Sequence, residues 1–128
     1  MKQIKVSKAT PIQLDWLVAK CESSDGRLIK LGGGWNGAFY IERENGPDSG
    51  GFHRFDPAND WAQGGPLVER ERITLDLYES GEWLAQIWGD DITDSDFEEC
   101  GPTPLIAAMR CYVSSRMGDE VEVPEELL

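Results

Sequence analysis

The chain has 128 residues and a mass of 14.3 kDa, which is the size of one domain and leaves no room for two independent cores. Hydrophobic residues make up 40% and charged residues 28%, as is typical of a soluble globular protein. The formal net charge of −12 disfavours general binding to a nucleic-acid backbone or to an anionic membrane surface.

The sequence predicts a cytoplasmic protein. No apolar run is long enough to span a membrane, and the basic start is not followed by the apolar core of a signal peptide. The three cysteines, Cys21, Cys100 and Cys111, cannot all pair within one chain and form no C-x-x-C unit. Reduced thiols are therefore expected.

The first 22 residues predict a short strand and a helix. Alternating apolar residues favour a strand over 3–7. Thr10 and Pro11 are preferred types at a helix N-cap and first position, and Gln13 completes a capping box, so a helix is predicted over 11–22. One apolar stripe of this helix should face the core: Leu14, Leu17, Val18 and Cys21.

The middle of the chain predicts strands and short turns. Aromatic and β-branched residues favour strands over 27–31 and 38–44, and 45–51 has the composition of a loop. Asp60 is expected to cap a single helical turn. The Gly64-Gly65-Pro66 segment should break this turn, and its proline should open a second one.

The last part of the chain predicts a hairpin and a second helix. The alternating runs 73–78 and 83–88 form the hairpin, and an acidic loop over 89–101 follows it. Thr103 should cap a helix that ends at Gly118, with a stripe of Ile106, Met109, Val113 and Met117.

The order of these elements predicts an α+β fold, with a small antiparallel sheet and two helices packed on one face. We expect a single domain over 1–128. Its last ten residues, 119–128, are an acidic tail in which a brief strand is predicted.

Negative charge is concentrated in the second half of the chain. The first 72 residues are neutral overall, whereas 73–109 hold nine acidic residues and no Lys or Arg. If the fold gathers these carboxylates on one face, that face would steer the protein toward a basic surface of another protein.

Two motif-like patterns have simpler structural explanations. The G-x-G-x-x-G spacing of Gly32, Gly34 and Gly37 precedes a predicted strand, whereas a phosphate site needs a helix there, so a flexible hairpin is favoured. The carboxylates of 90–99 are of the type that binds Ca²⁺ or Mg²⁺ but do not follow the EF-hand pattern. A solvated acidic loop is favoured.

No residue is assigned a catalytic role. His53 is the only histidine, and no pattern in the sequence identifies a nucleophile that it could activate. The acidic neighbours of Cys100 should raise the pKa of its thiol and oppose its reactivity. For a hydrolase based on carboxylates, the nearest candidates are Asp60, Glu69 and Glu71. The alternating charges of 69–72 favour local ion pairing instead, and no cofactor or metal site is expected.

The most unusual stretch is 60–71. Two glycines before a proline impose a specific backbone path, and Trp61 and Gln63 could present an aromatic face and an amide to a ligand or partner. In the alternative interpretation, which is favoured, Trp61 fills an open edge of the core.

Three segments resemble the NinX-like family of phage and prophage proteins: 15–21, 60–71 and 101–110. The strings D-W-A-Q-G-G-P and G-P-T-P-L-I-A-A-M-R are the most specific, and 118–124 is also similar. The resemblance implies a phage or prophage protein in the cytoplasm of a host bacterium. The family has no assigned biochemical function, so the resemblance brings no catalytic residues.

Two functional hypotheses follow. The first is a non-enzymatic accessory protein that binds a basic host or phage protein through an acidic face. The second is a small-ligand-binding or hydrolytic domain with a pocket around Trp61, Gln63 and Trp35. The candidate surface comprises Trp61, Gln63, Asp90, Asp91, Asp94 and Asp96. Self-association through the Leu127-Leu128 tail or the Trp-rich hairpin is a third hypothesis, and the oligomeric state stays open.

Overall fold

A computed structural model describes residues 1–22, 29–33, 39–43, 53–89 and 95–128. Among these residues it contains three α-helices: α1 (Pro11–Glu22), α2 (Trp61–Arg70) and α3 (Pro104–Met117). Two 3-10 turns lie near the ends of the chain: η1 (Val6–Lys8) and η4 (Glu125–Leu127). No helix in the described ranges has both the length and the apolar character needed to cross a membrane.

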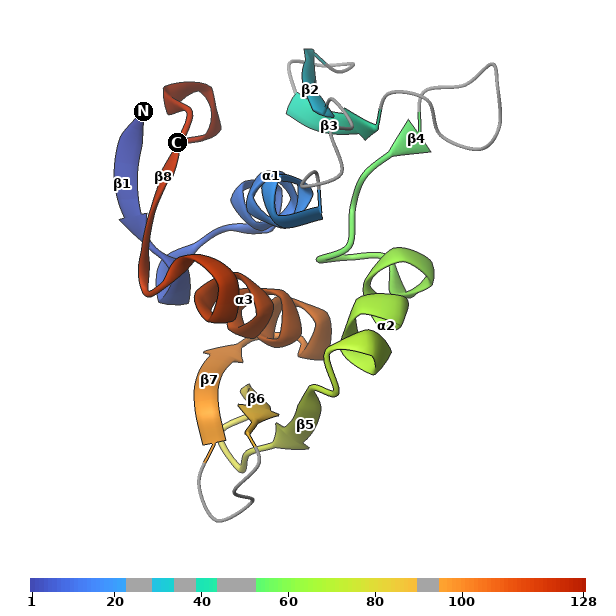
Figure 1. The fold of residues 1–128 in the computed structure, drawn as a ribbon, viewed down its shortest axis with the longest axis vertical. Coiled ribbons are helices and arrows are strands. Elements are labelled where there is room, and N and C mark those ends of the chain that lie inside the picture. Colours follow the sequence, from blue (N-terminus) through green and yellow to red (C-terminus); the bar gives the residue numbers. More distant parts are fainter. Residues whose placement is uncertain (23–28, 34–38, 44–52, 90–94) are drawn as a thin grey trace.

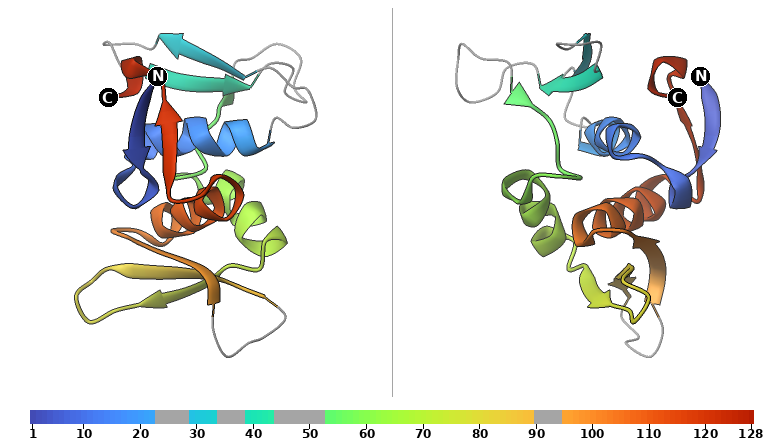
Figure 2. Two further views of the ribbon diagram at one scale, coloured as in Figure 1. Left: turned by 60° about the vertical axis from the view of Figure 1, so that its left-hand side comes forward. Right: turned by 180° about the vertical axis from the view of Figure 1, so that it is seen from behind.

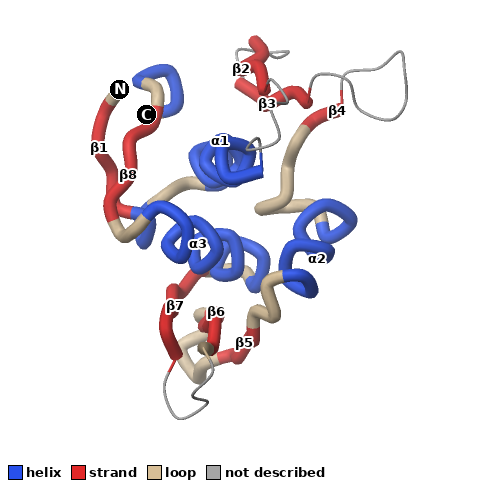
Figure 3. Tube along the Cα trace, viewed as in Figure 1, coloured by secondary structure: helices blue, strands red, loops and turns tan. Residues whose placement is uncertain are grey.

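The strands of the described residues form three small antiparallel sheets (Figures 1 and 3). The first sheet pairs β1 (Lys2–Lys5) with β8 (Glu120–Val123). The second contains β2 (Ile29–Gly33), β3 (Phe39–Arg43) and β4 (His53–Arg54). The third contains β5 (Thr74–Leu77), β6 (Trp83–Trp88) and β7 (Ser95–Gly101).

The helices α1 and α3 lie between the second and third sheets (Figure 2). α3 packs on β6 and β7, and α1 packs on α3. The predicted α+β class with antiparallel sheets is confirmed. The structure adds the helix α2 beside α3 and distributes the strands over three sheets.

Local capping explains where the two predicted helices begin. The Thr10 amide donates to Gln13 Oε1 at 3.0 Å, and the Thr103 hydroxyl accepts a hydrogen bond from the Ile106 amide at 3.1 Å. α3 ends at Gly118, whose φ of +92° lies in the left-handed region that favours glycine. These caps confirm the predicted helix starts and the predicted stop.

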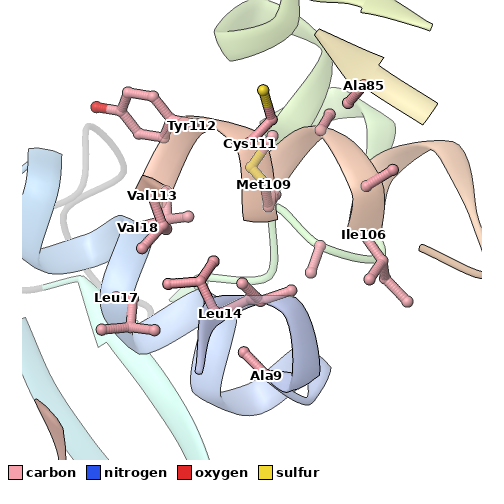
Figure 4. Close-up of a cluster of buried hydrophobic side chains, with 14 of the residues drawn as sticks. Ala9, Leu14, Leu17, Val18, Ala85, Ile106, Met109, Cys111, Tyr112 and Val113 are labelled. Atoms are coloured by element: carbon pink, nitrogen blue, oxygen red, sulfur yellow. The ribbon is translucent and has the colours of Figure 1, made fainter. Parts of the chain in front are cut away.

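α3 is the centre of the hydrophobic core. It is covered by the third sheet on one side and by α1 on the other, so its residues are buried around most of its circumference. Figure 4 shows Leu14 and Val18 of α1 on one side of α3 and Ala85 of β6 on another. The predicted stripes are confirmed for Ile106, Met109 and Val113 and for Leu14, Leu17 and Val18. Cys21 is half-buried and packs against the same core, as predicted, whereas Met117 is exposed.

Two local predictions are wrong. Residues 61–70 form one continuous helix rather than two turns separated by Gly64-Gly65-Pro66. Residues 95–101 form β7 rather than the end of an acidic loop, because they pair with β6 along their length. The predicted tail strand is confirmed as β8, which pairs with β1. The glycine-rich segment 34–38 and the loop 44–52 lie outside the described residues.

Candidate interaction site

Of the predicted surface residues that the structure describes, Trp61 and Gln63 lie apart from Asp96. Trp61 lies in the first turn of α2 with 53% of its surface exposed, and Asp96 is exposed on β7. α2 and β7 lie on different sides of α3 (Figures 1 and 2). The other predicted acidic residues, Asp90, Asp91 and Asp94, lie outside the described residues.

Gln63 is engaged in organising the start of α2. Its Oε1 accepts from the Asp56 amide at 2.9 Å, and its Nε2 donates to Asp60 Oδ2 at 3.0 Å. Asp60 also accepts from the Ala62 amide at 3.0 Å, which makes it the N-cap of α2, as predicted. The amide of Gln63 therefore holds the preceding segment against the helix.

The alternative role of Trp61, filling an edge of the core, does not match its exposure. The hypothesis of a ligand pocket around Trp61 and Gln63 also gains no support, since neither side chain lines either of the two hollows that lie beside β7. Trp35, the third residue of that hypothesis, lies outside the described residues.

Two adjoining hollows lie beside β7. The first has a volume of about 470 Å³ and is lined by Ser7, Tyr78, Glu82, Leu84, Glu98, Glu99, Cys100 and Arg110. The second has a volume of about 570 Å³ and is lined by Lys5, Ser7, Glu99, Asp119 and Glu120. Because the two hollows share Ser7 and Glu99, we treat them as one feature, the acidic groove. Five of its lining residues are acidic and two are basic, a formal net charge of −3.

Three parts of the chain supply the carboxylates of the acidic groove. Glu82 lies in the turn before β6, and Glu98 and Glu99 lie on β7. Asp119 and Glu120 come from the end of the chain. The Val6 amide donates to the Asp119 carbonyl at 2.9 Å, and this bond places the start of β8 beside η1.

Glu99 is the least exposed carboxylate of the groove. Its Oε1 accepts from the Ser114 hydroxyl of α3 at 3.0 Å. Burial raises the pKa of Glu99, and the negative charge of Asp119 raises it further, while the Ser114 hydrogen bond acts in the opposite direction. An added cation would relieve this repulsion, so Glu99 favours a positively charged neighbour.

Arg110, one of the two cations in the groove, is held by main-chain carbonyls. Its Nη1 donates to the Cys100 carbonyl and its Nη2 to the Ala9 carbonyl, both at 2.9 Å. Burial lowers the pKa of Arg110, and the nearby Glu99 and Glu82 oppose this shift. Arg110 therefore tethers β7 to the segment after η1 and does not pair directly with a groove carboxylate.

Cysteine and metal chemistry finds no support in the groove. Burial raises the pKa of Cys100, and Glu82, Glu98 and Glu99 raise it further, as predicted for Glu98 and Glu99. In the part of the chain that the structure describes, no group of three His, Cys, Asp or Glu side chains is arranged to hold a metal ion.

A comparison with protein families matches residues 5–116 to the family described as Bacteriophage P22, NinX. The chain belongs to this NinX family. The match ends at residue 116, so the resemblance of 118–124 stays a prediction. No curated protein matches the chain.

The segments on which the sequence resemblance rests are held in place by close contacts in the structure. Asp15 of α1 is buried, and its Oδ1 accepts from the Ala58 amide at 3.0 Å. A Cβ on Gly64 of α2 would lie 2.4 Å from the Pro57 carbonyl oxygen and 2.7 Å from Leu105 Cδ2 of α3. These contacts show that the D-W-A-Q-G-G-P string serves close packing of α2 against α3.

A second set of contacts joins the three helices of this NinX-family chain. Arg70 of α2 pairs with Glu22 of α1 and, at 3.2 Å, with its neighbour Glu71. Arg116 of α3 also donates to Glu71 at 2.6 Å. The favoured interpretation of 69–72, local ion pairing, is thus confirmed for Arg70 and Glu71, and Glu71 is engaged by two arginines.

The sequence interpretation missed most of the acidic groove. Glu98 and Glu99 were assigned to a solvated loop, and Asp119 and Glu120 to a tail, because these residues are about 20 positions apart in sequence. The sequence predicts a strand near each end of the chain, but only the structure shows that these two strands pair and so bring the end of the chain beside η1 and β7.

Proposed function

We propose that this NinX-family protein is a non-enzymatic accessory protein that binds a basic segment of another protein in the acidic groove. The partner is a protein of the phage or of its bacterial host, and binding takes place in the host cytoplasm. The observation that carries the proposal is the convergence of five carboxylates on two adjoining hollows, with Arg110 held by main-chain carbonyls.

The charge of the acidic groove should increase both the association rate and the affinity for a basic partner. A concave surface with one dominant sign of charge concentrates its field and accelerates association with a surface of the opposite sign. Glu99 adds to affinity because it is half-buried beside Asp119, where a cationic side chain would replace unfavourable repulsion by attraction.

The test is affinity capture from host lysate at low and at moderate salt, with wild-type protein and two double variants. Glu82→Lys with Asp119→Lys reverses one charge in each hollow. The matched control, Glu69→Lys with Glu125→Lys, makes the same change of net charge at exposed residues outside the groove. Circular dichroism establishes that both variants are folded.

We expect a protein that is captured by the wild type and by the control but lost with the groove variant, and whose capture weakens as salt rises. Equal capture by both variants, or capture of nothing above background by the wild type, would contradict the proposal.

A further inference from the structure

β7 is an edge strand whose free side borders the acidic groove. Within the described residues β7 pairs only with β6. Glu98, Glu99 and Cys100 of β7 line the groove, and Figure 1 shows β7 on the side of its sheet nearest β8. The edge of a sheet presents main-chain N–H and C=O groups with which another strand can pair.

The register of the sheet indicates which residues present these groups. The Tyr78 amide donates to the Glu82 carbonyl at 2.9 Å, so the main-chain groups of Glu82 point toward β5. Along an antiparallel strand the direction alternates from one residue to the next. The groups of Ala85 therefore point to β7, where Glu99 is the register partner. It follows that the main-chain groups of Glu98 and Cys100 point away from β6, to the free edge.

The contact of Arg110 agrees with this direction and marks one end of the available edge. Arg110 Nη1 reaches the Cys100 carbonyl from outside the sheet, at 2.9 Å. Beyond the strand ladders, the described residues contain no main-chain hydrogen bond to Glu98 or to the Cys100 amide. Both main-chain groups of Glu98 and the Cys100 amide are thus placed to pair with an added strand.

Each of the two faces that flank this edge carries one carboxylate of the acidic groove. Side chains of successive strand residues point to opposite faces. Glu98 shares a face with Leu84 and Cys100, which line the first hollow, whereas Glu99 points to the opposite face and lines both hollows, the second together with Asp119. An added strand would therefore place one side chain beside Glu98 and the next beside Glu99.

We propose that the partner's basic segment binds as an extended strand added to the free edge of β7. This inference rests on the proposed function and specifies the mode of binding and the class of segment. Main-chain hydrogen bonds to Glu98 and to the Cys100 amide hold the segment. Two consecutive Lys or Arg residues, one on each face, meet Glu98 and Glu99, so the segment contains at least one such pair.

The first test uses a labelled synthetic peptide, Thr-Lys-Lys-Thr-Lys-Lys, and a copy with every main-chain amide N-methylated. The two peptides carry the same charge, but the methylated copy cannot donate main-chain hydrogen bonds. Fluorescence anisotropy should show binding of the first peptide and an affinity loss of about tenfold or more for the copy. Equal affinities, or no binding of either peptide, would overturn strand addition.

The second test compares Glu98→Pro with Glu98→Ala. Both substitutions remove the carboxylate, but only proline also removes the N–H that points to the free edge, a position at which a sheet tolerates proline. The peptide should bind Glu98→Pro more weakly than Glu98→Ala, and equal binding would contradict the proposal. If Glu98→Pro does not fold, amide hydrogen exchange in the wild-type protein tests the same proposal.

In that experiment the bound peptide should slow hydrogen exchange at the amides of Glu98 and Cys100. The amide of Glu99 points to β6 and serves as an internal control. Binding of the peptide without this protection would reject strand addition and leave the proposed function intact. Failure of the proposed function is read separately, from equal capture by the groove and control variants.

Discussion

Arg70 donates two hydrogen bonds to the Glu22 carboxylate, at 2.8 and 3.0 Å, across a separation of 48 residues. The Tyr112 hydroxyl donates to the same carboxylate at 2.8 Å and accepts from Arg70 at 3.2 Å. These bonds connect α1, α2 and α3 at a single point. The arrangement is bidentate, which an arginine can provide and a lysine cannot.

Replacement of Arg70 should therefore destabilise the fold. We expect Arg70→Ala to lower the free energy of unfolding by about 1–2 kcal/mol, since half of the arginine side chain is in contact with solvent and its pair is correspondingly screened. Arg70→Lys, which keeps the charge without the two-point contact, should recover only part of the loss. Urea unfolding measures both, and full recovery by lysine would exclude a role for the bidentate geometry.

The same contacts predict how stability changes in acid. The Arg70 and Tyr112 hydrogen bonds lower the pKa of Glu22 below its ordinary value of 4.5 against the opposing effect of burial, and Arg116 and Arg70 lower that of Glu71. A carboxylate with a lowered folded-state pKa stabilises the fold above its unfolded-state pKa and loses this contribution as pH falls through the folded-state value. When unfolding is measured at successively lower pH from pH 6, the denaturant concentration at the midpoint should decrease once the pH is below about 4.5.

Arg70→Ala should reduce this acid sensitivity, because it removes the main partner that lowers the pKa of Glu22. If the variant and the wild type lost stability in parallel between pH 5 and pH 3, about the range over which carboxylates titrate, the assignment to Glu22 would be wrong.

The ionised carboxylate of Glu99 should have the opposite effect on stability from those of Glu22 and Glu71. Its pKa is raised by burial and by Asp119, so its ionised form opposes folding at neutral pH and this cost disappears as pH falls. Glu99→Gln keeps an oxygen that can accept from Ser114 and removes the charge. The variant should be more stable than the wild type at pH 7, with a gain that vanishes in acid. A loss of stability at pH 7 would contradict this sign.

Two adjacent glycines of α2 provide a matched pair of substitutions. Gly64→Ala places a methyl group 2.4 Å from the Pro57 carbonyl oxygen, and we expect a destabilisation of about 2–3 kcal/mol. Gly65→Ala meets only the Trp61 ring, at 3.8 Å, and gains helix propensity, so it should be neutral or stabilising by up to about 1 kcal/mol. Thermal unfolding distinguishes them, and similar effects at both positions would argue against the close approach of α2 to Pro57.

The cysteines should differ in their reactivity with a thiol reagent. Burial raises the pKa of Cys111 to about 12 and that of Cys21 to about 11, whereas Cys100 lies at the border of the acidic groove with a smaller upward shift. Labelling of the native protein at pH 8 should modify Cys100 first and Cys111 last. Mass spectrometry of partly labelled protein would reveal the order, and early modification of Cys111 would indicate opening of the core.

How much of the fold follows from the sequence depends on how local the signals are. The starts of α1 and α3 are predictable because Thr10 and Thr103 begin short capping motifs. The β5–β6 hairpin is predictable because its alternation is regular. α2 is not, since Gly64 and Pro66 weaken the helix locally. It forms because Asp60 and Gln63 organise its first turn and because Gly64 permits contact with Pro57.

The acidic groove depends on contacts between distant parts of the chain and could not be derived from local patterns. β7 has few apolar residues, and its strand conformation comes from pairing with β6. Asp119 reaches the groove because its carbonyl accepts from Val6, more than a hundred residues earlier. The concentration of negative charge after Arg72 predicts an acidic surface, but the pairing of the first and last strands determines where the groove lies.

That pairing has a practical consequence for experiments on the protein. β1 and β8 are joined in register from Lys2 opposite Val123 to Lys5 opposite Glu120, and the two ends of the chain lie close together in Figure 1, far from β5 and β6. A short linker between the ends should therefore yield a cyclised chain with the native fold and a less disordered unfolded state. A permuted chain could be opened instead at the exposed turn around Gly81, where φ is +89° and there is open space.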